Sequence, residues 1–176
     1  RVVVAGASGL VGTQLCALLT SGGHHVTRLV RTSAKGNPDA ARWDPAAHKL
    51  DPRILEGADA VVNLSGHSIG GRFTRGHKGK VLTSRLDATA TLAGAAAEAR
   101  VPTLVQASAI GYYGPRRPNE LLTEGSAPGD GFLAATVRAW EAAAQPAADA
   151  GVRVALLRTG IVLSEGGGAL APQVPL

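Results

Sequence analysis

The sequence predicts an α/β protein built on a doubly wound parallel sheet. Three observations predict it: short apolar runs rich in valine and leucine recur along the chain, helical patterns separate them, and three glycines follow the first run. Near-continuous apolar strands that alternate with helices are typical of a parallel sheet covered on both faces, with right-handed crossovers. A chain of 176 residues is long enough to bury one such core.

The expected strands are short β-branched or leucine-rich runs bounded by turn residues. They cover residues 2–5, 25–31, 59–65, 103–108 and 152–160. Apolar spacing and alanine content predict helices between them, over residues 11–21, 80–99 and 131–150. Pro146 should kink or break the last helix, because proline removes a backbone donor and clashes with the preceding turn. Cys16 falls at an apolar position of the first helix and is expected to pack as a small hydrophobe.

The first strand leads into a glycine turn. Gly6, Gly9 and Gly12 form G-x-x-G-x-x-G, which differs by one residue from the spacing G-x-G-x-x-G. Glycines at such a turn let the backbone approach a pyrophosphate, whose charge then lies at the helix N-terminus. Glycines also serve tight turns, so a purely structural turn is the alternative. The position between the first strand and the first helix favours dinucleotide binding, and with it a Rossmann-type domain.

The residues after the second strand bear on which dinucleotide is bound. An acidic side chain there would accept hydrogen bonds from the adenosine ribose, and the chain has none at that place. It has instead a basic and hydroxyl-bearing segment, made of Arg31, Thr32, Ser33 and Lys35. This segment favours the 2′-phosphate of NADP, with NAD left open. The alternative is that Arg31 caps a sheet edge or stays in solvent.

Charge and composition weigh against several classes of function. The formal charge is +5 and the pI is about 10.0, yet aromatic residues are sparse and the charges are mixed, which argues against a nucleic-acid partner. One basic cluster is either a solvated loop and first helical turn or an anion-binding wall: Arg72, Arg75, Lys78, Lys80 and Arg85. No apolar run reaches the roughly 18 residues of a membrane span. The histidines lack metal-ligand spacing, so no metal site is expected.

The single cysteine and the lack of a secretion signal fit a reducing compartment, so a cytoplasmic location is expected.

Several segments carry a resemblance: VVVAGASGLVGTQL, DAVVNLSG, RWDPAAHKLD, SRLDAT, SAIGYYG, WEAAA and LLRTGIVLSEGGGAL. Together they resemble the extended short-chain dehydrogenase/reductase superfamily, and more closely its YfcH-like branch of NAD(P)-dependent sugar epimerases and dehydratases. RWDPAAHKLD is similar to the W-x-P hairpin segment of that branch. The resemblance implies a Rossmann-type dinucleotide-binding domain over residues 1–160. Residues 161–176 would begin a C-terminal substrate-binding region that is largely missing.

The resemblance also implies roles for particular residues. The pyrophosphate turn would consist of Gly6, Ser8, Gly9, Leu10 and Val11, with Gly12 completing the glycine spacing. The segment beside the adenosine ribose and pyrophosphate would consist of Leu64, Ser65 and Gly66. Ser108 would hydrogen-bond the reacting substrate oxygen, although its hydroxyl could instead satisfy nearby backbone. Tyr112 and Tyr113 are candidate acid/base groups or, more simply, an aromatic wall of the substrate site.

The chain departs from the superfamily at its acid/base pair. Superfamily enzymes carry Y-x-x-x-K on the helix after the fourth strand. Aligned through Glu141, these two positions fall on neutral side chains: Phe132 or Leu133 for the tyrosine, and Thr136 or Val137 for the lysine. None of them can exchange a proton near pH 7. Glu124 and Glu141 are further candidates for proton transfer, with a solvated or capping carboxylate as the simpler interpretation of Glu141.

Two functions from different classes follow. The first is an NAD(P)-dependent epimerase or oxidoreductase that acts on a sugar-like or nucleotide-linked small molecule, which the glycine turn and Ser108 favour. The second is a catalytically silent NADP-binding protein with a regulatory or interaction role, which the missing pair favours. Either function is compatible with the fold. Neither nucleic acid nor a membrane is expected as a partner, and a homodimer is left open.

Overall fold

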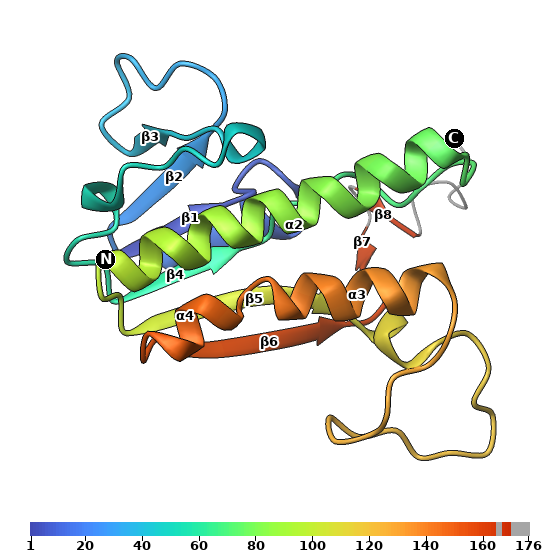
Figure 1. Cartoon of the computed structure of the whole chain (residues 1–176). Helices are drawn as coiled ribbons and strands as arrows, with labels where there is room; N and C mark the ends of the chain where they lie inside the picture. The colour runs from blue at the N-terminus through green and yellow to red at the C-terminus, as the bar shows by residue number, and fades with distance from the viewer. Residues whose placement is uncertain (165–166, 170–176) are drawn as a thin grey trace.

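A computed structural model describes residues 1–164 and 167–169 of the chain. Its main sheet has six parallel strands in the order β3-β2-β1-β4-β5-β6 (Figure 1). The strands are β1 (Val2–Ala5), β2 (Val26–Val30), β3 (Ala40–Arg42), β4 (Ala60–Asn63), β5 (Thr103–Ala109) and β6 (Arg153–Thr159). The helices are α1 (Leu10–Ser21), α2 (Arg75–Glu98), α3 (Phe132–Ala142) and α4 (Gln145–Asp149). The predicted doubly wound parallel sheet is confirmed.

A small antiparallel hairpin follows the main sheet. Its strands are β7 (Leu163–Ser164) and β8 (Gly167–Gly168), at the start of the segment 161–176 that the sequence assigns to the substrate-binding region. The other residues of that segment from 165 to 166 and from 170 to 176 lie outside the described residues. The division of the chain at residue 160 therefore stays a prediction.

Strand β3 is absent from the sequence prediction. Its three residues, Ala40–Arg42, lack β-branched side chains and are partly or fully exposed, so they carry no strand periodicity. Tertiary pairing forms the strand instead, because it adds to β2 and is followed by a bond from the Trp43 N–H to the Val30 carbonyl oxygen. After it, Asp44 and Lys49 pair in an antiparallel bridge, which confirms a hairpin in the W-x-P segment.

Two helices differ in their bounds from the prediction. Helix α2 begins at Arg75 rather than near residue 80, because the Thr74 hydroxyl caps it by accepting a hydrogen bond from the His77 N–H at 3.2 Å. The predicted helix over 131–150 is divided into α3 and α4. Pro146 lies in the first turn of α4, where the missing proline N–H costs no helical hydrogen bond. The break expected at Pro146 is therefore confirmed.

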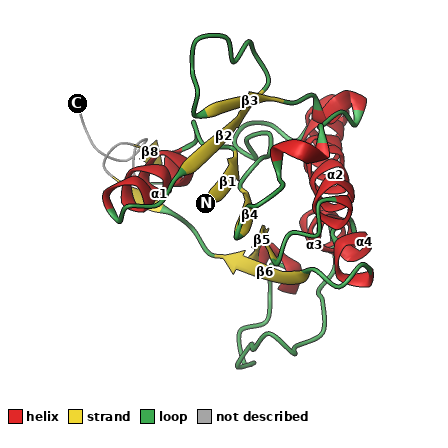
Figure 2. Cartoon of the chain, turned by 90° about the vertical axis from the view of Figure 1, so that its left-hand side faces the viewer, coloured by secondary structure: helices red, strands yellow, loops and turns green. Residues whose placement is uncertain are grey.

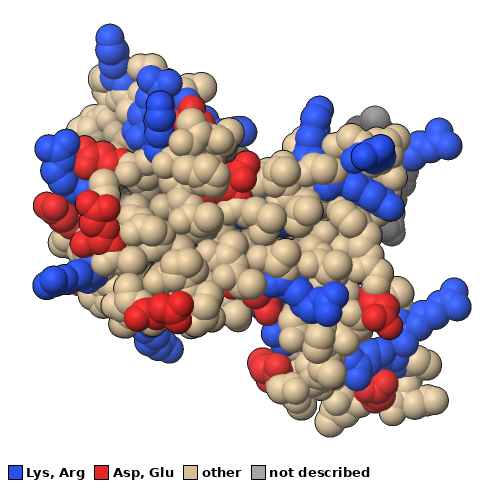
Figure 3. Space-filling model, in the orientation of Figure 1, with Lys and Arg blue, Asp and Glu red and all other residues tan. Residues whose placement is uncertain are grey.

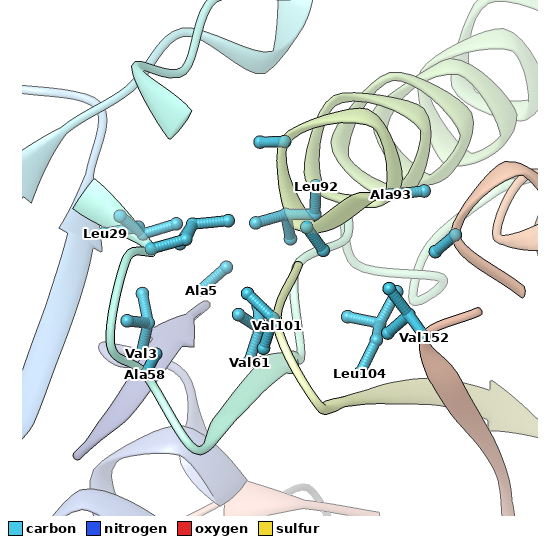
Figure 4. Packing of buried hydrophobic residues seen from close by; sticks show 14 of the residues in the cluster. Val3, Ala5, Leu29, Ala58, Val61, Leu92, Ala93, Val101, Leu104 and Val152 are labelled. Atoms are coloured by element: carbon cyan, nitrogen blue, oxygen red, sulfur yellow. The ribbon is translucent and has the colours of Figure 1, made fainter. Parts of the chain in front are cut away.

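The larger core lies beneath α2, α3 and α4, which cover one face of the sheet (Figure 2). Leu92 of α2 points toward the sheet, where Val61 and Leu104 lie, and Ala93 of the same helix belongs to the same cluster; all four are 0% exposed (Figure 4). The many alanines of α2 let the helix backbone lie close to the strands. Burial of this face fixes the long α2 helix across the middle of the sheet.

Helix α1 lies over the opposite face, where it contacts β1 and β2. Cys16 of α1 is 3% exposed and packs in a smaller cluster with Val4, Val26 and Val62, which confirms the predicted packed cysteine. Strand alternation places Leu157 of β6 on the same face, and its side chain is 49% exposed. Helix α1 therefore covers this face mainly over β1 and β2 and leaves Leu157 of β6 partly exposed.

The parallel sheet brings the carboxyl ends of its strands to one edge. The glycine turn follows β1, Arg31 follows β2, Leu64 follows β4, and a short 3₁₀ helix, Ile110–Tyr113, follows β5. Strands β1 and β4 are neighbours although β2 and β3 lie between them in sequence, so the chain reverses its direction of winding here. Open α/β sheets bind ligands outside the carboxyl ends at such a switch point.

Candidate functional site

A cleft of about 610 Å³ opens at this switch point. Its wall includes seven of the residues predicted to bind cofactor: Gly6, Ser8, Gly9, Arg31, Leu64, Ser65 and Gly66. Leu10 instead lines a second cavity, of about 760 Å³, which lies between the first turn of α1 and the β7-β8 hairpin. Gly9 and Ser8 border both cavities, so open space lies on two sides of the glycine turn.

The three glycines of the turn meet different requirements. Gly6 has φ +79°, and a Cβ there would lie 2.6 Å from the Leu64 carbonyl carbon. A Cβ on Gly12 would lie 2.2 Å from the Gly6 carbonyl oxygen, so the close approach of α1 to the turn requires a glycine there. Gly9 has φ −77°, and a Cβ would meet its nearest atom, the Gly6 carbonyl oxygen, only at 3.4 Å. The fold therefore needs Gly6 and Gly12, whereas the space at Gly9 is available to a ligand.

The β2 side of the cleft is formed by residues of both charges. Arg28 and Arg31 line it, and Asp44 and Asp87 line it as well. The segment after β2 has no carboxylate, as the sequence predicts. Asp44, which follows β3, and Asp87 of α2 nevertheless place two carboxylates in the wall of the same cleft. Arg31 is exposed, so its guanidinium is accessible to an anionic group.

The other three basic or hydroxyl-bearing residues after β2 do not line the cleft. Thr32, Ser33 and Lys35 are exposed, and the Ser33 hydroxyl accepts a hydrogen bond from the Lys35 N–H at 3.3 Å. This local bond stabilises the turn after β2. The structure thus brings only Arg31 of that segment into the wall of the cleft.

Asn63 holds the segment after β4 in position. Its side chain is 0% exposed, and its Oδ1 accepts a hydrogen bond from the Ser65 N–H at 3.0 Å. Its Nδ2 donates to Thr89 Oγ1 at 3.1 Å and to Gln106 Oε1 at 2.9 Å. The Leu64 N–H donates to the Ala5 carbonyl oxygen, which joins the segment to β1. Buried polar groups that are all hydrogen-bonded hold a unique geometry, so the wall of the cleft is tied to the core.

Ser108 lies at the end of β5 and is 4% exposed. Its Oγ donates a hydrogen bond to Glu141 Oε1 at 2.5 Å. Arg158 of β6 binds the same carboxylate through two bonds, Nε to Oε1 at 2.9 Å and Nη2 to Oε2 at 3.0 Å. The side chains of Glu141 and Arg158 are 10% and 16% exposed, so the simpler interpretation of Glu141 as a solvated carboxylate is wrong. Sequence reasoning missed the pair because its members lie on different elements.

Electrostatics keep this carboxylate ionised. Burial alone would raise the pKa of Glu141, but the hydrogen bonds from Arg158 and Ser108 and the charge of Arg158 outweigh it, and the pKa lies below its ordinary value. The bond to Glu141 raises the pKa of Arg158 in turn. The two groups therefore form an ion pair at neutral pH.

Both predicted tyrosines lie against Arg158. The Arg158 Nη1 donates to the Tyr113 hydroxyl at 3.0 Å, and the Arg158 Cζ lies 3.5 Å from the centroid of the Tyr112 ring. The two rings meet edge to face, with centroids 5.3 Å apart. No lysine lies near the tyrosines in sequence, yet the fold brings the Arg158 guanidinium to Tyr113 from 45 residues away. Ser108 thus bonds the carboxylate of the Glu141–Arg158 pair, and both tyrosines contact its half-buried arginine.

The expected acid/base positions lack a titratable side chain in space as well as in sequence. A Cβ on Gly111, just after β5, would lie 3.7 Å from Leu133 Cβ and 3.9 Å from Val137 Cγ2. Thr136 and Val137 are each 4% exposed. Phe132 packs against Phe73, with ring centroids 5.8 Å apart. None of these side chains supplies a titratable group beside the end of β5.

The basic cluster gathers over the N-terminal part of α2, at the upper right of Figure 3. Its members differ in environment: Arg72, Arg75 and Lys80 are exposed, whereas Lys78 and Arg85 are half-buried. Lys78 Nζ lies 5.2 Å from the centroid of the Phe132 ring. The exposed members fit a solvated helix start, whereas the Arg85 side chain is turned into the protein.

Within residues 1–164 and 167–169, no group of three or more histidine, cysteine, aspartate or glutamate side chains is arranged to hold a metal ion. None of the helices in this part of the chain combines the length and the apolar character needed to cross a bilayer.

A parallel sheet with a glycine turn at its switch point and free space beside Gly9 defines a Rossmann-type protein of the nucleotide-binding class. Residues 2–174 match the NAD dependent epimerase/dehydratase family, and the chain belongs to that family. The family-level resemblance drawn from the sequence is confirmed.

Relatives of known sequence and structure agree with this assignment. An epimerase family protein of Mycobacterium bovis is 43% identical over 176 residues, which are 99% of this chain and 58% of that protein. The solved nucleoside-diphosphate sugar epimerase from Corynebacterium glutamicum has a TM-score of 0.84 and 44% identity, over 98% of this chain and 36% of that one. The human epimerase family protein SDR39U1 (isoform 2), solved with NADPH, has a TM-score of 0.83 and 36% identity, over 98% of this chain and 58% of that one. The chain spans less than two thirds of each.

Proposed function

We propose that this chain binds NADP(H) at the glycine turn and forms the dinucleotide-binding part of an epimerase-type oxidoreductase. The observation that carries the proposal is the open space beside Gly9. Neither the backbone conformation nor the packing of the chain requires a glycine at this position. The human relative was solved with NADPH, and the C. glutamicum relative is named a nucleoside-diphosphate sugar epimerase. These two facts support NADP as the cofactor and a nucleotide-linked sugar as the substrate class.

The residues around the cleft fit the parts of such a cofactor. Backbone N–H groups at the start of α1 would hold the pyrophosphate, whose charge the helix dipole favours. Arg31 would pair with the 2′-phosphate, and the segment Leu64, Ser65 and Gly66 would lie along the ribose. When bound, the nicotinamide supplies hydride transfer to or from a carbon of the substrate.

Ser108, Tyr112 and Tyr113 are the proposed residues on the substrate side. The Ser108 proton is donated to an ionised carboxylate, so its Oγ can accept a hydrogen bond from a substrate hydroxyl. Tyr112 and Tyr113, held by Arg158, would form an aromatic wall. In this arrangement the chain orients a sugar hydroxyl and shields it from water.

A second candidate function is a silent NADP-binding protein with a regulatory or interaction role. The specific observation in its favour is that Leu133 and Val137 fill the place beside Gly111 where an acid/base pair would be needed. Under this function the chain would bind cofactor with the same residues and would transfer no hydride.

Titration of the 176-residue chain with NADPH, followed by ligand fluorescence, tests the proposal. Saturable binding with one site per chain supports it, and no binding would refute it. A panel of nucleoside-diphosphate sugars, assayed for epimer formation or NADPH consumption, bears on the second candidate: turnover by the chain would refute the silent protein, whereas binding without turnover is expected of this chain under either function. The cytoplasmic location remains a prediction, and the homodimer remains open.

A further inference from the structure

Arg85 occupies an unusual position between the cofactor segment and helix α3. Its Nη1 donates hydrogen bonds to the His67 carbonyl oxygen at 2.9 Å and to the Val81 carbonyl oxygen at 3.0 Å. A Cβ on Gly66 would lie 3.2 Å from the Arg85 Cζ, so the guanidinium lies directly against the loop after β4. On its other side, the Cζ is 5.0 Å from the centroid of the Trp140 ring.

The charge of this guanidinium has no carboxylate partner in the described part of the chain. None of the five ion pairs between described residues involves Arg85, whereas Arg158 is paired with Glu141. Burial lowers the pKa of Arg85, although an arginine stays protonated in proteins. Burying an unpaired charge costs stability, so a partner outside this part of the chain would offset the cost.

Arg85 also keeps donors for such a partner. Both hydrogens of Nη1 are used by the two carbonyl oxygens, while Nε and Nη2 form no hydrogen bond to the described residues. Neither nitrogen is among the fully buried unpartnered atoms of that part of the chain. Up to three N–H groups are therefore available to a ligand that lies along Gly66.

The place of Arg85 bears on the missing lysine. The family resemblance puts that lysine at Thr136 or Val137, on the helix turn before Trp140, and both residues are neutral and 4% exposed. Arg85 reaches the same helix from α2 and lies at its Trp140. The Arg85 guanidinium thus lies between the loop that borders the cofactor cleft and the turn of α3 that follows Thr136 and Val137.

We propose that Arg85 binds the nicotinamide nucleotide half of the cofactor, as a positioning residue that supplies the positive charge absent from positions 136 and 137 of α3. The inference rests on the proposed function, since it requires a dinucleotide in the cleft. It predicts that binding of the two halves of the cofactor depends on two different arginines. Arg31 would bind the adenosine half, which carries the 2′-phosphate, and Arg85 would bind the other half.

Titration calorimetry with NADPH and with 2′,5′-ADP, which is the adenosine half alone, tests the inference on the 176-residue chain. Arg85→Met should weaken NADPH binding about 10- to 100-fold, as expected for loss of a charge-assisted hydrogen bond, and leave 2′,5′-ADP within about twofold. Arg85→Lys keeps the charge and should lose less NADPH affinity than Arg85→Met. Arg138→Met, which removes an exposed arginine of α3, should change neither affinity.

Other results would overturn the inference. Equal weakening of both ligands by Arg85→Met would mean that Arg85 only shapes the loop at Gly66, and unchanged NADPH binding would mean that it has no role. If the Arg85→Met variant does not fold, the Arg85→Lys variant decides. Weakened NADPH binding with unchanged 2′,5′-ADP binding, each relative to the unmutated chain, supports the inference. Equal weakening of the two ligands, or no change in either, refutes it. Failure of the unmutated chain to bind either ligand would instead refute the proposed function.

Discussion

Ser108 donates its hydroxyl proton to Glu141, and Glu141 is in turn bound through both oxygens by Arg158. The three side chains come from β5, α3 and β6, so the contact joins the end of the sheet to the helix that covers it. It also determines what Ser108 can do. An Oγ that donates to a carboxylate can accept from a substrate hydroxyl, but it has no second proton to donate to a carbonyl oxygen.

The Glu141–Arg158 pair should contribute stability that depends on pH. Because the pKa of Glu141 is lower in the folded chain than the ordinary value of 4.5, the contribution is fully present above about pH 5. It is lost as the pH falls through the folded-state pKa. Glu141→Gln should lower the free energy of unfolding at pH 7 by about 1–3 kcal/mol, because the half-buried Arg158 loses its carboxylate partner, and should flatten the acid limb of the stability curve.

Urea unfolding from pH 3 to pH 7 measures this effect. Glu98→Gln, at an exposed position near the end of α2, is the matched control and should change the free energy of unfolding by less than about 0.5 kcal/mol. A Glu141→Gln curve parallel to that of the unmutated chain would show that the pair contributes nothing that depends on pH.

The glycine turn should separate folding from binding. Gly9→Val should abolish NADPH binding and leave the chain folded, because the side chain enters ligand space from an ordinary backbone conformation. Gly12→Ala should instead destabilise the fold by about 1–3 kcal/mol, because its Cβ meets the Gly6 carbonyl oxygen. Thermal unfolding and NADPH titration of both variants check the pair. Undiminished NADPH affinity in Gly9→Val would make all three glycines structural.

Cofactor preference should depend on Arg31. The unmutated chain is expected to bind NADPH more tightly than NADH, and Arg31→Ala should remove most of the difference, which is about 1.5–3 kcal/mol for a charge-assisted contact. Lys35→Ala is the control, because Lys35 is exposed and does not line the cleft. Equal affinities of the unmutated chain for the two dinucleotides, measured by competition, would refute the assignment of the 2′-phosphate to Arg31.

Catalysis by this chain is expected to be undetectable. Leu133 and Val137 cannot reproduce a tyrosine activated by a lysine, and positioned acid/base catalysis contributes about 10²–10⁴-fold to rate. The measurement is NADPH oxidation with a panel of nucleotide sugars and simple carbonyls. Robust turnover would contradict the expectation, and Ser108 would then be the first residue to test as a substrate contact. In that case Ser108→Ala should abolish turnover and keep NADPH affinity if Ser108 contacts substrate.

The fold was predictable where the signal is local. The β-branched run before Gly6 and the apolar spacing after it are contained in a few consecutive residues, and both elements form as predicted. Ala40–Arg42 has no such signal, because the strand exists only through pairing with β2. The start of α2 was missed because its signal is one hydroxyl, that of Thr74, ahead of a glycine- and lysine-rich segment without apolar periodicity.

The candidate site was also predictable only where the signal is local in sequence. The positions of Gly9 and Arg31 follow from the strands that precede them, so their place at the cleft could be read from the order of elements. The partners of Ser108 could not, because Glu141 and Arg158 meet it only through the packing of α3 and the register of β6 against β5. Arg85 was grouped with its basic neighbours by sequence, and only the direction of its side chain separates it from them.

The hydrogen bonds of Asn63 carry a consequence for the exchange of backbone hydrogens with solvent. The Ser65 N–H belongs to a loop at an open cleft, where amides ordinarily exchange fast. It is bound to the fully buried Asn63 side chain, which is bound to Thr89 and Gln106, and Thr89 also accepts a hydrogen bond from the Trp140 indole at 2.9 Å. That one amide is thus anchored to a network that joins β4, β5, α2 and α3. The wall of the cleft should exchange with the slow core of the sheet, as part of the same cooperative unit, even when nothing is bound.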